Sequence, residues 1–176
     1  MTTTHVALLR GINVGGVTVP MERLRKLATD LGWTGATTYL ATGNLMLETC
    51  ESSTTVAKRL SVALRTEFSR DVPVVVRTPA QLAEVLERAR PVYPHAEPRR
   101  VQVAFLDRDP GTGADERLGD FAPDEHRHLG LELVLHYPHG QARTKLTTSV
   151  IERRLDVVAT VRGLGTLDSL LARSGG

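Results

Sequence analysis

Short apolar runs and helical periodicities follow one another along this chain in an order that predicts its fold. In the first half, strand-like runs occupy residues 5–10, 37–42, 45–49 and 72–77. Between them, apolar residues with the spacing of one helix face run through residues 20–32 and 56–68. This order predicts the βαββαβ unit of a ferredoxin-like plait, in which Gly43-Asn44 is the hairpin turn and Pro73 marks an edge strand.

The same order of segments returns in the second half. A capping box at Thr78–Gln81, with Pro79 at the first helical position, begins a helix that ends before Pro91. Further strand-like runs occupy residues 100–106, 124–129, 131–137 and 157–162. Helical segments occupy residues 113–118, 147–155 and 167–171, and Ser149–Glu152 is predicted to be a second capping box.

The proline-rich stretch 91–98 is the best boundary between the halves. We therefore predict an α+β protein made of two ferredoxin-like α/β plaits (βαββαβ) packed into one compact unit. The first plait comprises residues 1–90 and carries a glycine-rich loop. The second comprises residues 91–176 and ends in a C-terminal helix.

Composition narrows the class of protein without identifying a ligand. Hydrophobic residues make up 41% and charged residues 24%, which excludes disorder. The apolar runs are too short for a membrane span of about 20 residues or for a signal peptide, and Cys50 has no cysteine to pair with. These features predict a cytoplasmic protein. A net charge of +2 and an aromatic content of 4% argue against a nucleic-acid partner that stacks bases on the sheet.

One group of polar and glycine residues follows the first predicted strand. Parallel first and second strands would bring the loop with Arg10, Gly11, Asn13, Gly15 and Gly16 beside the hairpin at Asn44. Glycines let a ligand approach the backbone, and exposed N–H groups before a helix attract anions. One interpretation is therefore a phosphate-binding loop. The other is that these glycines are turn residues and Arg10 is a surface residue, since the loop matches neither a P-loop nor a dinucleotide motif.

A second group lies in the second half, where the third and fourth strands of the plait run parallel. Their ends would bring Arg143 and Lys145 near Arg162. This cluster is interpreted as a second anion site or as solvated loop charge.

Catalytic and metal-binding patterns are weak. His126 and His128 alternate on one strand, but no third ligand follows at a zinc-like spacing, so no metal is predicted. His5 is the histidine nearest to the glycine-rich loop, and it begins the first strand. No catalytic residue and no cofactor are predicted.

Three motifs in this sequence resemble one protein family. They are LLRGINVGG at residues 8–16, TYLATGN at 38–44 and RTKLT at 143–147, and the family is the uncharacterised bacterial domain of unknown function 1697. The resemblance implies a compact α/β protein of two plait-like halves and no established activity. The family pattern falls on the following residues: Arg10, Gly11, Asn13, Gly15, Gly16, Gly43, Asn44, Lys145 and Thr147.

This chain departs from the family near the C-terminus. The family's Thr-x-Arg-Asn-Trp-x-Thr signature falls on residues 160–166, where Gly163 and Leu164 replace the asparagine and tryptophan. The function expected is binding of a small anionic metabolite or nucleotide through the loop Arg10–Gly16. The alternatives are a transferase or hydrolase acting on such a substrate, or an oligomerisation module that pairs edge strands.

Overall fold

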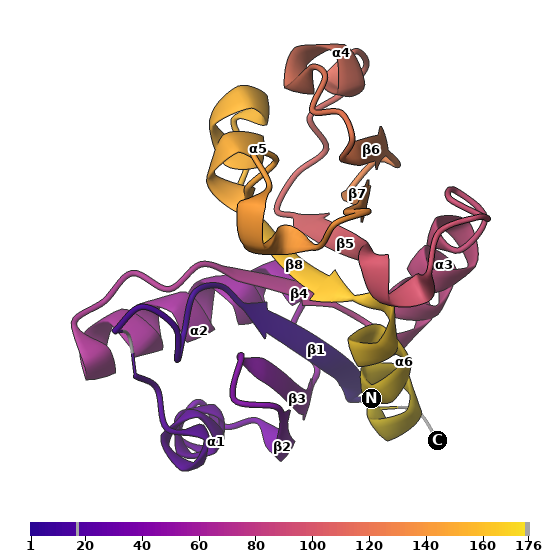
Figure 1. Ribbon diagram of the computed structural model, residues 1–176. Helices are drawn as coiled ribbons and strands as arrows, with labels where there is room; N and C mark the ends of the chain where they lie inside the picture. Colours follow the sequence, from indigo (N-terminus) through magenta and orange to yellow (C-terminus); the bar gives the residue numbers. More distant parts are fainter. Residues whose placement is uncertain (17, 175–176) are drawn as a thin grey trace. The chain divides into compact units, whose positions relative to one another are not determined.

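The computed structural model describes residues 1–16 and 18–174, which form two compact units (Figure 1). The first unit consists of Met1–Leu82 with Leu170–Gly176, and the second of Ala83–Ser169. The change from one unit to the other falls inside helix α3 (Pro79–Ala89), whereas the sequence predicts a boundary after residue 90.

The first unit is a four-stranded antiparallel sheet with two helices. Its strands β1 (Thr3–Leu9), β2 (Thr34–Tyr39), β3 (Asn44–Thr49) and β4 (Val74–Arg77) lie in the order β2-β3-β1-β4. Helices α1 (Met21–Asp30) and α2 (Ser53–Phe68) cover one face of this sheet (Figure 1). Ala7 and Leu9 of β1 project into that core because alternate residues of a strand share a face.

The strands of the first unit differ in their bounds from the predicted runs, most of all β2. The run 37–42 was expected to be a strand, but β2 spans Thr34–Tyr39 and ends where Leu40 adopts a left-handed φ of 58°. The turn therefore precedes Asn44, which is the first residue of β3 rather than a turn residue. An exposed edge strand carries little apolar alternation, so the pattern did not locate its ends. The prediction that β4 lies at an edge is confirmed.

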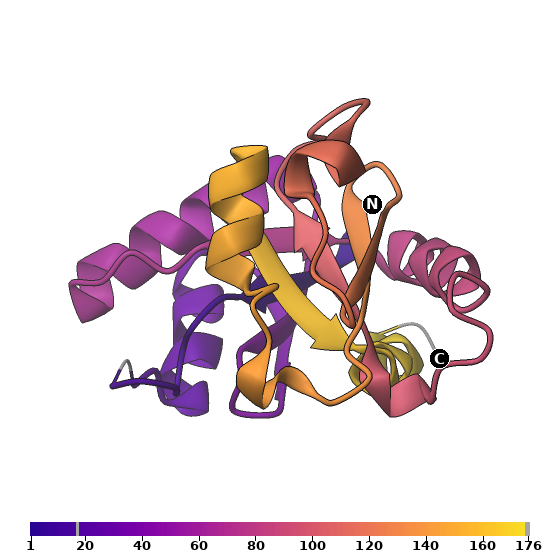
Figure 2. The ribbon, with the colours of Figure 1, turned by 45° about the horizontal axis from the view of Figure 1, so that its top comes forward.

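The second unit repeats this strand order with its own helices. Its strands β5 (Val101–Leu106), β6 (Glu125–His128), β7 (Glu132–His136) and β8 (Ala159–Gly163) lie in the order β6-β7-β5-β8, again antiparallel. Helices α4 (Ala114–Leu118) and α5 (Thr148–Leu155) pack on one core, and α5 runs beside β8 (Figure 2). Short 3-10 turns η1 (Pro98–Arg100) and η2 (Gln141–Arg143) precede β5 and α5.

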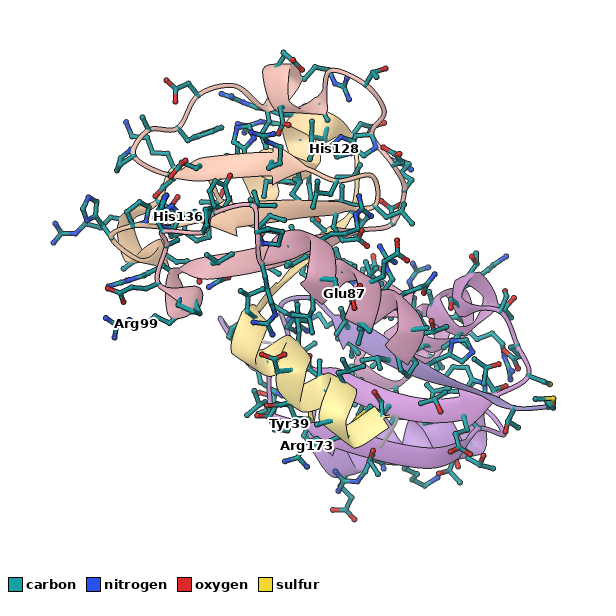
Figure 3. All side chains as sticks on the ribbon, turned by 90° about the vertical axis from the view of Figure 1, so that its right-hand side faces the viewer. Tyr39, Glu87, Arg99, His128, His136 and Arg173 are labelled. Atoms are coloured by element: carbon teal, nitrogen blue, oxygen red, sulfur yellow. The ribbon has the colours of Figure 1, made fainter. Side chains whose placement is uncertain are left out.

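Helix α6 (Leu164–Ser174) ends the described chain, and its last turn belongs to the first unit. There the Arg173 guanidinium lies 4.6 Å from the centre of the Tyr39 ring, a cation–π contact that ties the helix end to β2 (Figure 3).

The two predicted capping boxes have different outcomes. The first is confirmed: Thr78 N donates to Gln81 Oε1 at 2.9 Å, and Gln81 N donates to Thr78 Oγ1 at 3.3 Å. The second is wrong, because Thr147 caps α5 by accepting from Val150 N and Ser149 lies within the helix. The Glu152 carboxylate instead accepts from Ala159 N at the start of β8.

None of the helices in residues 1–16 and 18–174 is both long and apolar enough to cross a lipid bilayer.

Candidate functional site

The glycine-rich loop (residues 10–16) leaves the end of β1 and is held in place by one side chain. Asn13 Nδ2 donates to Val19 O at 3.0 Å and to Ala41 O at 2.6 Å, while its Oδ1 accepts from Val19 N at 2.8 Å. These three bonds tie the loop to the entry of α1 and to the β2–β3 turn. The amide of Asn13 therefore shapes the loop, which the sequence alone did not reveal.

The backbone of this loop alternates in handedness. Gly11, Asn13 and Gly15 have φ values of 70°, 56° and 60°, whereas Ile12 and Val14 keep negative φ. Alternation of this kind turns successive N–H groups towards one side and forms a concave site for an anion. In the part of the chain that the structure describes, nothing accepts a hydrogen bond from the N–H groups of residues 11–16. Ile12 is buried, whereas Gly11, Asn13, Val14, Gly15 and Gly16 are exposed.

The glycines of the loop are needed for backbone conformation and access. A Cβ at Gly11, Gly15 or Gly16 would meet no heavy atom within 4 Å, so packing does not select glycine there. The positive φ at these three positions does select glycine, because this conformation is strained for residues with a side chain.

The turn beside the loop is closed by contacts that explain its glycine and asparagine. A Cβ on Gly43 would lie 2.7 Å from Ile12 Cδ1 and 2.9 Å from Leu9 Cβ, so only glycine lets Ile12 pack here. Asn44 is fully buried, and its Nδ2 donates to Tyr39 O at 2.8 Å. The structure thus brings the loop and the turn together as predicted, and it gives Asn44 a turn-closing bond.

Arg10 stands at the start of the loop and is half-buried. Its backbone N–H donates to Pro73 O at 3.0 Å, which joins the loop to the segment before β4. The guanidinium adds positive charge to this end of the sheet.

Comparison with known proteins places the chain in a family through this same region. The model of a family described as "Protein of unknown function (DUF1697)" matches residues 1–132. The chain belongs to the DUF1697 family. The match includes the glycine-rich loop and the turn at Gly43-Asn44, and it ends before the RTKLT motif and the C-terminal signature.

A solved structure shares the fold over the whole chain. This DUF1697 protein is similar to a conserved bacterial protein from Streptococcus pneumoniae, with a TM-score of 0.71, 19% identity and 98% coverage of both chains. A comparison with curated proteins gave no match.

Arg143 and Arg162, two of the predicted second-half residues, occupy different surroundings. Arg143 is exposed at the end of η2, where it lines a pocket of about 440 Å³ that does not include Arg162 among its lining residues. Arg162 is buried, and it lies on the face of β8 opposite to Val161, which packs against the α4–α5 core, because alternate residues of a strand point to opposite faces. Burial lowers the pKa of Arg162 to about 10, and its guanidinium donates to Thr160 Oγ1 and Val161 O.

Lys145 is exposed in the segment between η2 and α5. Ligand contacts of Lys145 and Arg162 stay predictions. At the departures from the family signature, Gly163 ends β8, and Leu164 begins α6 as a buried residue.

The histidines of the second unit form pairs that sequence reasoning missed. His126 Nδ1 lies 2.8 Å from Asp115 Oδ1, His128 Nε2 lies 3.2 Å from Asp109 Oδ1, and His136 Nδ1 lies 2.9 Å from Glu125 Oε1. Figure 3 labels two of them, His128 on β6 and His136 on β7. The acidic segment 107–120 supplies two of these carboxylates, those of Asp115 and Asp109.

His5 lies away from the glycine-rich loop. It sits near the start of β1, where it is 2% exposed and its Nδ1 is 3.2 Å from Ser53 Oγ at the start of α2. Burial lowers its pKa, against the opposing effect of Glu51. A buried histidine near the opposite end of the strand cannot act as a base for a ligand at the loop.

Proposed function

We propose that this DUF1697 protein binds a small phosphate-bearing anion, a metabolite or a nucleotide, through the backbone N–H groups of the glycine-rich loop. The observation that carries the proposal is the alternating φ of residues 11–15 in an exposed loop whose N–H donors have no acceptor among the described residues. Unpaired N–H donors in a backbone of alternating handedness favour negative charge.

Charge around the loop supports the same ligand class. Residues 10–19 contain no aspartate or glutamate, and Arg10 is the one charged residue in that range. An anion would therefore meet no like charge from within the loop itself. The Asn13 bonds hold the loop in its conformation before binding, which lowers the entropy cost of association.

Binding, rather than turnover, is the function proposed for this site. Catalysis of hydrolysis or group transfer needs a positioned acid, base or nucleophile. The loop supplies amides and one guanidinium, and His5 is buried elsewhere.

The test is a titration with inorganic phosphate, pyrophosphate and AMP at low salt, followed through the amide resonances of the wild-type protein. The amides of Gly11, Gly15 and Gly16 are expected to shift with saturation. The Val14→Glu variant places a carboxylate in the loop at a residue that is 57% exposed, so the fold should tolerate it. Affinity should fall on the order of tenfold, because like charges about 5 Å apart repel by about 1–3 kcal/mol near a protein surface.

Val62→Glu is the matched control, since Val62 is 54% exposed on α2 and the substitution changes the net charge equally. It should leave affinity unchanged. Equal effects of both variants would mean that net charge alone drives binding. The proposal fails if no anion shifts the loop amides.

We also infer that each unit is a ferredoxin-like plait, which the orders β2-β3-β1-β4 and β6-β7-β5-β8 support. A cytoplasmic location is part of the same proposal, and the unpaired Cys50 supports it.

A further inference from the structure

A second polar pocket lies within the second unit, apart from the glycine-rich loop. Its volume is about 440 Å³, which is within the range of small-ligand pockets. It is lined by residues just before β6 and by the connection from β7 to α5: Pro123, Asp124, His139, Gly140, Ala142, Arg143 and Thr144. Asp124 and Arg143 bring opposite charges to one cavity.

The carboxylate of Asp124 is fixed in its position. Its Oδ2 accepts a hydrogen bond from Thr144 Oγ1, which in turn accepts from Leu146 N at 2.9 Å. This chain of bonds leaves the second carboxylate oxygen of Asp124 without a bond to another described residue.

Arg143 and Asp124 do not neutralise each other. Within residues 1–16 and 18–174, the Arg143 guanidinium makes no ion pair within 4.0 Å, although both side chains line the same pocket. Two opposite charges held apart around a cavity can each bind a complementary group of one ligand.

Two guanidinium groups lie at this pocket. Arg143 lines it, and Arg100 Nη1 lies 2.6 Å from the position that a Cβ of Gly140, another lining residue, would take. Asp124 is the one carboxylate among the lining residues. A ligand with more negative than positive charge therefore fits better than a neutral zwitterion.

We infer that this pocket binds a small phosphomonoester that carries an amino group. The phosphate would pair with Arg143, whose planar guanidinium suits bidentate phosphate recognition, and the ammonium would pair with Asp124. This inference does not rest on the proposed function of the glycine-rich loop, since the two sites share no residue.

The experiment compares three related probes by isothermal titration calorimetry: phosphoethanolamine, ethyl phosphate and ethylamine. Wild-type protein should bind phosphoethanolamine most tightly. Arg143→Gln should weaken phosphoethanolamine and ethyl phosphate by about tenfold each, because it removes a charge-assisted pair. Asp124→Asn should weaken phosphoethanolamine but strengthen ethyl phosphate, so that the preference between these two probes disappears.

Matched variants separate these effects from general changes of charge or fold. Arg127→Gln and Asp120→Asn alter exposed residues of the same types outside the pocket and should change neither affinity. In the Asp124→Asn variant, the side-chain amide oxygen can still accept from Thr144. Unchanged thermal unfolding of that variant would verify that the pocket is intact.

Glycerophosphoethanolamine, a diester with one negative charge fewer, separates a free monoester from a lipid-type headgroup. Weaker binding of the diester is expected. Absent binding of phosphoethanolamine at millimolar concentration, or a preference over ethyl phosphate that persists in Asp124→Asn, would overturn the inference. Equal binding of monoester and diester would overturn it as well.

Discussion

The two units share a strand order but differ in how the loop after their first strand is hydrogen-bonded. The backbone bonds that begin the two loops correspond: Leu9 N–Gly43 O and Arg10 N–Pro73 O in the first unit, Leu106 N–Leu131 O and Asp107 N–Val158 O in the second. In the second unit the Asp109 carboxylate accepts from Gly111 N at 2.8 Å, and the Arg117 guanidinium donates to Pro110 O at 2.6 Å. That loop is closed by its own charged side chains.

The first unit has no acidic residue at the corresponding place. Asn13 fixes the outline of its loop, and the N–H groups of residues 11–16 have no acceptor among the described residues. In the second unit, the Gly111 N–H donates to the Asp109 carboxylate. In the first unit, the N–H groups of the loop have no carboxylate acceptor among the described residues. The N–H donors of the loop after the first strand can thus be hydrogen-bonded by a side chain of the same loop or left for a ligand. The presence of an aspartate in the loop distinguishes the two cases.

The largest effect is expected at the turn that supports the open loop. Gly43→Ala should destabilise the protein by about 3 kcal/mol in urea unfolding, because it adds a Cβ 2.7 Å from Ile12 Cδ1 at a φ of 94°. In the second unit, the carbonyl that corresponds to that of Gly43 belongs to the exposed Leu131. Glycine at position 43 is therefore required by the packing of Ile12 and not by the topology of the fold.

Gly32→Ala is the control for this substitution. Gly32 has a φ of 84°, but a Cβ there would meet nothing within 4 Å, so the cost should be about 1 kcal/mol. Equal losses in the two variants would show that the contact with Ile12 is unimportant.

A smaller effect is expected from the side chains that hold each loop. Asn13→Gly should cost about 2 kcal/mol, since it removes three hydrogen bonds while keeping the positive φ accessible. Asp109→Ala should cost about 1 kcal/mol, because that carboxylate holds Gly111 N and faces His128. Urea unfolding of both variants measures the difference, and a larger loss for Asp109→Ala would contradict the comparison.

Local patterns predicted most of the fold because strands and helices are encoded by the periodicity of nearby residues. The helix at Val56–Phe68 and the capping box at Thr78–Gln81 need only a few neighbours to be recognised. The ends of β2 could not be found in this way, because the left-handed conformation of Leu40 leaves no signal in an exposed edge strand.

The arrangement of the residues around the loop and the pocket depended on contacts that the sequence does not show. Glycines and Asn13 placed the loop, yet the role of Asn13 depends on Ala41, which lies 28 residues further along the chain. The pocket at Arg143 needs Asp124, and the two are brought together by a hairpin that the sequence outlines only roughly. The orientation of Arg162 followed from strand alternation, but its burial depended on packing.

The smallest effect concerns the first strand itself, where a histidine of the first unit corresponds to a glutamine of the second. His5 stands four residues before Leu9, and Gln102 stands four before the corresponding Leu106. Burial lowers the pKa of His5 below its ordinary value of 6.5, and its Nε2 has no hydrogen-bond partner among the described residues. Protonation then favours the unfolded chain, so the stability contributed is fully present above pH 6.5 and is lost as the pH falls through the lowered pKa.

His5→Gln gives the first unit the residue type of the second and should remove this pH dependence. The measurement is the free energy of unfolding in urea at about pH 7.5 and about pH 5, where the variant should lose less stability on acidification than the wild type. His95→Gln, at an exposed histidine, should keep the wild-type slope. If His5→Gln also keeps the wild-type slope, the acid sensitivity lies elsewhere in the protein, and His5 and Gln102 are equivalent in their effect on the pH dependence of stability.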